Sequence, residues 1–100
     1  MNGKGGTSSG RRKITFAFEA PGAREVVLAG SFNDWSLKKH AMKRDGQGVW
    51  TRTVMLLPGS YEYKYYVDGQ WCEDPCNERC CPNCFGGLNN VVKVCSKRSL

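Results

Sequence analysis

The sequence lacks any apolar run long enough to cross a membrane. A spanning helix needs about 20 predominantly apolar residues, and no stretch of this 100-residue chain approaches that length. The opening residues, MNGKGGTSSG, also lack the apolar segment of a secretory signal, so residues 1–12 are interpreted as a disordered leader. We therefore expect a cytoplasmic domain that has no membrane partner.

Groups suited to catalysis are also scarce. The one histidine, His40, lies in KKHAMK with no evident partner and is expected to be exposed. The nine acidic residues fall mostly in turns, and no two are spaced so that strand geometry would pair them for acid–base work. At this length the chain forms one domain at most. The sequence predicts a domain that is not an enzyme.

The positive charge is concentrated at the two ends of the chain. The formal net charge is +6, and the terminal basic residues are Lys4, Arg11, Arg12, Lys13, Lys97 and Arg98. Basic segments attract nucleic acid, but no RNA-recognition, zinc-finger or helix-turn-helix signature accompanies these. We interpret them as solvated tails, with residues 97–100 as a short tail, and do not expect nucleic acid as a partner.

Helical periodicity is absent, whereas alternation with a period of two recurs between turn signals. Apolar residues alternate in KITFAFEA, EVVLAG, VWTRTVMLL and YEYKYYV, and turns are indicated by PG, RDGQG, LPGS and DG. A further short strand is expected at residues 70–73, and NNVVKVC is expected to be the last strand. Six or seven short strands predict an all-β, immunoglobulin-like antiparallel β-sandwich over residues 13–96. Alternation assigns five aromatic residues to its core: Phe16, Phe18, Trp50, Tyr63 and Tyr65.

Two tryptophans do not fit the core pattern. Trp35 lies in the turn SFNDWS, and Trp71 follows the Asp-Gly turn signal in DGQW. Lys64 points away from the core face of its strand, so a hairpin would bring it near Trp71. Flat aromatic rings bind the apolar faces of pyranose sugars, while amines and amides bind the hydroxyls. Alternation alone leaves two interpretations open, a sugar platform or two plugs at the ends of the sandwich.

Cysteine is unusually dense in one segment. Five of the six cysteines lie within residues 72–84, which show no periodicity and are expected to form one long loop; the sixth is Cys95. Three interpretations remain open. A structural zinc could be held by Cys72, Cys76, Cys81 and Cys84 with the spacing C-x3-C-x4-C-x2-C. Alternatively, disulfides could staple the loop, or the thiols could be free.

The order of the sequence motifs along the chain is similar to that of a known protein family. APGAREVVLAGSFNDW, GVW, LLPGSYEYKYYVDGQW, DP and FGGLNNVVKV follow one another along the chain. This order resembles carbohydrate-binding module family 48, and most of all the glycogen-binding domains of AMP-activated protein kinase β subunits. The resemblance covers residues 14–94 and implies an early-set immunoglobulin-like sandwich. The dense cysteines are not part of the family pattern.

The resemblance implies a function and a set of site residues. It implies non-catalytic binding of α-1,4-linked glucans, such as glycogen, starch and maltooligosaccharides, that targets an attached or partner enzyme or a kinase subunit. No cofactor is required. Asn33 would hold its turn through side-chain bonds to the backbone, and Gly87 replaces a polar sugar contact. The implied sugar-binding residues are Trp35, Lys64, Trp71, Phe85 and Asn89. The alternative is a protein-interaction module of a kinase-type complex with a vestigial sugar site.

Overall fold

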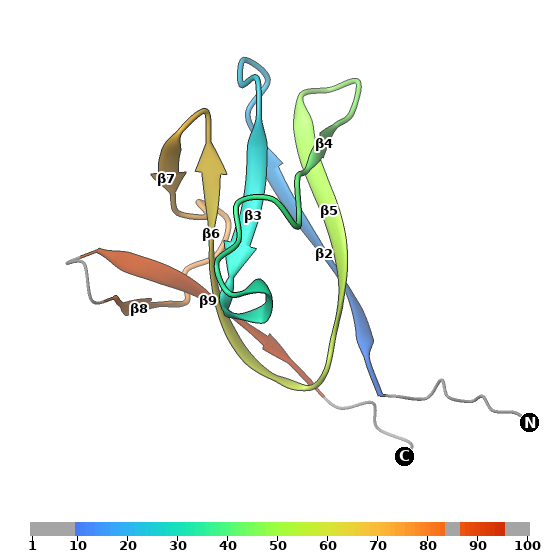
Figure 1. The fold of residues 1–100 in the computed structure, drawn as a ribbon, viewed down its shortest axis with the longest axis vertical. Coiled ribbons are helices and arrows are strands. Elements are labelled where there is room, and N and C mark those ends of the chain that lie inside the picture. The colour runs from blue at the N-terminus through green and yellow to red at the C-terminus, as the bar shows by residue number, and fades with distance from the viewer. Residues whose placement is uncertain (1–9, 84–86, 96–100) are drawn as a thin grey trace, which may run out of the picture.

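The computed structural model describes residues 10–83 and 87–95 (Figure 1). Its strands, in chain order, are β2 (Arg12–Glu19), β3 (Val26–Gly30), β4 (Lys43–Arg44), β5 (Val49–Leu56), β6 (Gly59–Val67), β7 (Gln70–Cys72), β8 (Cys80–Pro82) and β9 (Leu88–Val94). One 3₁₀ turn, η1 (Ser31–Asn33), follows β3. No helix in the described part of the chain is long and apolar enough to span a bilayer.

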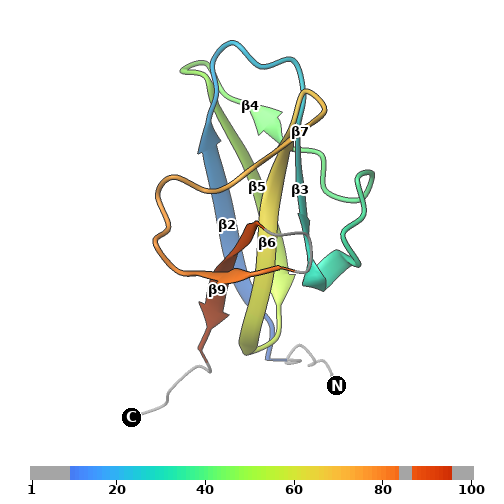
Figure 2. The same cartoon turned by 90° about the vertical axis from the view of Figure 1, so that its left-hand side faces the viewer.

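The strands form two antiparallel sheets, which confirms the predicted all-β sandwich. One sheet has the order β2-β5-β4, and the other has the order β3-β6-β9-β8. Strand β6 pairs with β3 along one edge, while its other edge is divided between β9 at residues 59–63 and β7 at residues 65–67. Figure 2 shows β7 and β9 at opposite ends of β6. Strand β6 is therefore central to the second sheet.

The core forms where the inward faces of the two sheets meet. Alternation places bulky side chains on these faces because successive residues of a strand point to opposite sides. Tyr63 packs edge-on against Phe16, with ring centroids 5.0 Å apart, and Tyr65 packs against Phe18 at 4.7 Å. The aromatic positions assigned to the core from the sequence are confirmed. The buried cluster contains Phe16, Val26, Leu28, Met42, Trp50, Val54, Leu56, Tyr63, Tyr65 and Val94, with Phe18 packed against it.

Three sequence-based boundaries are corrected by the structure. Residues 72–84 are not one long loop, because Cys72 ends β7 and residues 80–82 form β8. A three-residue edge strand that ends in proline leaves almost no periodic signal. The strand expected at residues 70–73 ends at Cys72, and Arg12, expected in the leader, opens β2 opposite Leu56.

A partly buried polar network fixes the segment between β7 and β8. The Tyr63 hydroxyl donates to Asp74 Oδ2 at 2.7 Å, and the Asp74 amide donates to Asn90 Oδ1 at 2.6 Å. Asn77 Nδ2 donates to the Tyr63 hydroxyl and to the Val91 carbonyl, each at 2.9 Å. Burial holds the pKa of Tyr63 well above its usual range, so the phenol stays protonated and can donate. These bonds attach the segment to β6 and β9.

We expect Gly30→Ala to destabilise the sandwich. A β-carbon at Gly30 would lie 2.4 Å from the Glu62 carbonyl oxygen and 2.8 Å from Phe32 Cε2, so the sheet would have to shift. The expected loss in the free energy of unfolding is about 1–3 kcal/mol, as for other overpacking substitutions. Urea denaturation measures it. Gly46→Ala is the control, because a β-carbon there meets no atom within 4 Å. Equal stability of the two variants would contradict the prediction.

Asn90→Ala should also destabilise the fold. Asn90 is 1% exposed, and its removal leaves the Asp74 amide without its side-chain acceptor and the Asn77 carbonyl without its side-chain donor. Buried groups left unsatisfied cost about 1–3 kcal/mol. Thermal and urea unfolding measure the change, with the exposed Gln47→Ala as control. A variant as stable as the wild type would show that the network contributes nothing.

Candidate functional site

A groove of about 750 Å³ lies on the outward face of β6. Alternation along β6 explains its position, because Glu62 and Lys64 face outward while Tyr63 and Tyr65 are buried. The loop after η1 supplies Trp35, β7 supplies Trp71, and the β8–β9 hairpin supplies the far side. The lining residues are Trp35, Glu62, Lys64, Trp71, Pro82, Asn83, Gly87 and Asn89.

The structure brings together four of the five sugar-binding residues expected from the sequence. Trp35, Lys64, Trp71 and Asn89 all line the groove. The fifth, Phe85, lies outside the described residues. Alternation alone did not show whether the two tryptophans form a sugar-binding platform or fill the ends of the sandwich. The structure places both on the same groove, so their side chains are available to a ligand.

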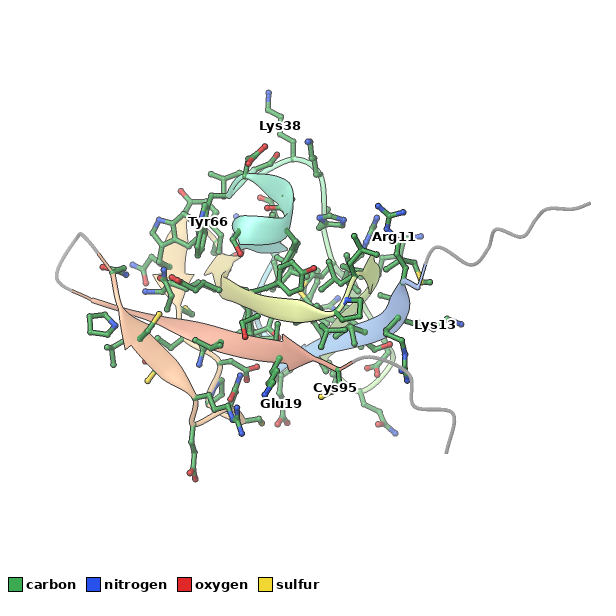
Figure 3. All side chains as sticks on the ribbon, turned by 90° about the horizontal axis from the view of Figure 1, so that it is seen from below. Arg11, Lys13, Glu19, Lys38, Tyr66 and Cys95 are labelled. Carbon is green, nitrogen blue, oxygen red and sulfur yellow. The ribbon has the colours of Figure 1, made fainter. Side chains whose placement is uncertain are left out.

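The two indoles stand at a steep angle to each other. The ring centroids of Trp35 and Trp71 are 6.2 Å apart, with an interplanar angle of 73°. Tyr66, labelled in Figure 3, supports Trp71 from β6, with centroids 4.8 Å apart. Trp71 is 46% exposed and Trp35 is half-buried. The result is an angled aromatic surface whose rings are held by edge and tilted contacts.

Asn33 holds the turn that presents Trp35, as the sequence predicts. Asn33 Oδ1 accepts from the Gly30 amide at 3.0 Å, and Asn33 Nδ2 donates to the Leu28 carbonyl at 3.1 Å. The Trp35 amide in turn donates to the Gly30 carbonyl at 2.9 Å. Trp35 adopts a left-handed φ of 59°, which is uncommon for a bulky residue. The surrounding hydrogen bonds maintain this conformation.

His40 has a partner, so the expectation that it is exposed and alone is wrong. Its Nδ1 lies 2.8 Å from Asn33 Nδ2, and the ring is half-buried beside Phe32. Residues 40–42 fold back on β3, with the Leu28 amide donating to the His40 carbonyl. Burial, and after it the charges of Arg52 and Lys39, lower the pKa of His40. No periodic pattern in the sequence indicates this return of the chain.

A chain of hydrogen-bonded polar side chains forms the wall opposite the indoles. Asn83 Nδ2 donates to Asn89 Oδ1, and Asn89 Nδ2 donates to Glu62 Oε1, each at 3.0 Å. The Gly87 amide donates to Asn83 Oδ1 at 3.0 Å, which closes the turn after β8. Sequence reasoning missed Glu62, Pro82 and Asn83 as lining residues. Alternation could have indicated Glu62, which shares the face of Lys64, but nothing in the sequence points to Asn83.

The cysteines do not converge in the described part of the chain. Residues 10–83 and 87–95 contain no group of three histidine, cysteine or acidic side chains placed to hold a metal. Register explains this, because Cys81 pairs with the groove residue Asn89 while Cys72 pairs with the buried Tyr65. These two cysteines therefore belong to opposite faces of the sheet. Cys84 lies outside the described residues, so the four-cysteine zinc set stays a prediction.

Cys81 belongs to the polar wall. Its partial burial, and then its hydrogen bond with Glu62, raise the pKa of the thiol. Cys72, Cys76, Cys80, Cys81 and Cys95, the cysteines within the described residues, form no disulfide in this structure. A protonated thiol can donate to the Glu62 carboxylate. Cys81 therefore extends the hydrogen-bonded series from Glu62 toward β8.

Comparison with known proteins identifies the family. A model described as the glycogen recognition site of AMP-activated protein kinase matches residues 12–99. The chain is 39% identical over 74 residues to the human 5'-AMP-activated protein kinase subunit beta-2, covering 73% of this chain and 26% of the relative. It is 40% identical over 73 residues to the rat subunit beta-1, with the same shares.

A plant protein is also similar. Protein PTST homolog 2, chloroplastic, of Arabidopsis thaliana is 49% identical over 53 residues, which cover 53% of this chain and 10% of that protein. The chain thus spans about a quarter or less of the length of these relatives. The family match agrees with the order of the sequence motifs. It also agrees with the observed β-sandwich and its groove. This chain belongs to the family of the glycogen recognition site of AMP-activated protein kinase.

Proposed function

We propose that the groove binds α-1,4-linked glucans without catalysing any reaction on them. The observation that carries the proposal is the meeting of two steeply angled indoles, Trp35 and Trp71, with Lys64 and Asn89 around one groove. Indole faces take up the apolar C–H faces of successive glucose rings. Because α-1,4-linked chains curve, angled rings suit them better than they suit a flat cellulose chain.

The polar wall supplies directional contacts to the sugar hydroxyls. Glu62 and Asn83 fix the orientation of the Asn89 amide, since each binds one end of it at 3.0 Å. The amide keeps one more proton on Nδ2 and further acceptor capacity on Oδ1 for hydroxyl groups. Lys64 donates from its ammonium group on the same side. We expect binding in the micromolar to millimolar range, roughly, because few rings are buried and hydroxyls must be desolvated.

The domain would act by targeting. Several of its relatives are named as kinase subunits, and the chain spans only part of them. We propose that this domain brings an attached catalytic domain or a partner kinase subunit to glycogen or starch, and that it has no catalytic role of its own. The cytoplasmic location stays a prediction, and one relative is named as chloroplastic. The family match and the assembled groove favour this role over a protein-interaction module with a vestigial sugar site.

Replacing either tryptophan should abolish most of the binding. Trp35→Ala and Trp71→Ala each remove one face of the platform, and each should weaken maltoheptaose binding about tenfold or more, as for other central aromatic anchors. Retardation in a native gel that contains glycogen, followed by calorimetric titration, measures the change. Met55→Ala is the control, because Met55 is exposed on β5 in the other sheet. Wild-type mobility that glycogen does not alter would favour the protein-interaction module.

We propose that binding requires no metal or other cofactor. The segment between β7 and β8 is held by Asp74, Asn77 and Asn90 without any contribution from a cysteine side chain to those bonds. A chelator or a reductant should therefore change maltoheptaose affinity by less than about twofold, a shift below that of one hydrogen bond. Mass measurement under native and denaturing conditions separates bound zinc from the hydrogens lost to disulfides. Loss of binding with chelator would show that a structural zinc is needed.

A further inference from the structure

We infer that His40 is a positioning residue for the Trp35 platform, and that it serves this role only as a neutral imidazole with an unprotonated Nδ1. The inference rests on the proposed function, because its consequence for binding requires that Trp35 contact the glucan. His40 lines no part of the groove. It acts through Asn33, the side chain that holds the turn before Trp35.

The orientation of the Asn33 amide is fixed by its two backbone partners. The Gly30 amide is a donor, so the atom 3.0 Å from it must be the Asn33 oxygen. The Leu28 carbonyl is an acceptor, so the atom 3.1 Å from it must be the Asn33 nitrogen. Asn33 is 4% exposed, and water has little access to it. Flipping the amide would place donor against donor and acceptor against acceptor.

This orientation determines the tautomer of His40. Asn33 Nδ2 carries two protons, and one is donated to the Leu28 carbonyl. The other faces His40 Nδ1 at 2.8 Å, so Nδ1 must accept and the ring proton must be on Nε2. A protonated imidazole has a proton on both nitrogens. Its Nδ1–H would then face the Nδ2–H of Asn33, and the contact would change from attractive to repulsive.

The surroundings of His40 keep the ring near Asn33 and oppose its positive charge. The Leu28 amide donates to the His40 carbonyl at 3.0 Å, which anchors this part of the chain to β3. From η1, the uncharged ring of Phe32 lies 5.9 Å away, centroid to centroid. The charged groups that act on His40 are cations, Arg52 from β5 and Lys39 from its own segment. Both favour the neutral imidazole.

Protonation of His40 would change the position of Trp35 through the hydrogen bonds that link His40, Asn33, Gly30 and Trp35. Either the ring withdraws from Asn33 or the amide rotates and gives up its bonds to Gly30 and Leu28. The Gly30 carbonyl also accepts from the Trp35 amide. If Gly30 moves, this bond weakens and Trp35 can leave its left-handed conformation. Because burial lowers the pKa of His40 below its ordinary value of about 6.5, the platform stays intact at that pH and is lost only as the pH falls further, through the lowered pKa.

The test compares maltoheptaose affinity of the 100-residue chain at about pH 7.5 with its affinity at a lower pH at which the NMR signal of the imidazole shows that His40 is protonated. Wild-type affinity should fall about three- to tenfold at the lower pH, the range for one lost hydrogen bond. His40→Gln offers an amide acceptor that does not titrate, so it should bind nearly as the wild type does at both values. His40→Phe keeps a ring beside Phe32 but offers no acceptor, so it should bind weakly at both.

A structural measurement separates this inference from the proposed function. Nitrogen-15 NMR of the imidazole should show a protonated Nε2 and an unprotonated Nδ1 at the higher pH, and the Trp35 indole signal should move as His40 titrates. If the wild type binds no glucan at the higher pH, the proposed function fails, and these two signals alone decide the role of His40. A protonated Nδ1 in the neutral ring would overturn the inference. Maltoheptaose affinity that stays constant while His40 titrates would also overturn the inference.

His40→Phe could lose affinity simply by unfolding. Thermal melting at the higher pH identifies that case, and His40→Gln then carries the comparison by itself. Lys39→Gln is a matched control, because it removes a neighbouring charge without touching Asn33. It should leave affinity at the higher pH unchanged. A fall in His40→Gln affinity at the lower pH equal to that of the wild type would also overturn the inference.

Discussion

The strict alternation of side chains along β6 is the constraint on which the rest of this structure depends. Tyr63 and Tyr65 point inward and make aromatic contacts with β2, while Glu62, Lys64 and Tyr66 point outward. A shift of one residue in register would exchange these two sets and destroy both the core and the groove. The burial of two tyrosines therefore fixes the direction of the binding groups on the opposite face.

Buried amide side chains attach the segments around the groove to β3 and β9, the two strands that pair with β6. On one side Asn33 joins the turn of Trp35 to β3, and on the other Asn90 joins the segment after β7 to β9. Both amides lie below 5% exposure and bond to backbone groups. Loops without regular structure need such partners, because their backbone groups would otherwise be unsatisfied when buried. The aromatic platform is thus positioned by polar bonds rather than by apolar packing alone.

Most of the fold and much of the site could be predicted from the sequence, because both follow local patterns. Alternation identified the core aromatics, and motif order identified Trp35, Lys64, Trp71 and Asn89. The parts that were missed depend on how irregular loops and short hairpins fold back on themselves, for which the sequence carries no periodic signal. His40 reaches Asn33 only because residues 40–42 return to β3, and Asn83 reaches Asn89 only across a hairpin whose first strand has three residues. The interpretation of residues 72–84 as one loop failed for the same reason.

The sequence by itself determined the two-faced strands, the turns between them and the residue types available for binding a sugar. These follow from the period of two and from turn chemistry, which act between neighbours in the chain. Only the tertiary structure decided that Trp35 and Trp71 meet at 73°, that Glu62 orients Asn89, and that His40 contacts Asn33. These contacts depend on how strands pair and loops return, and no local pattern encodes that geometry.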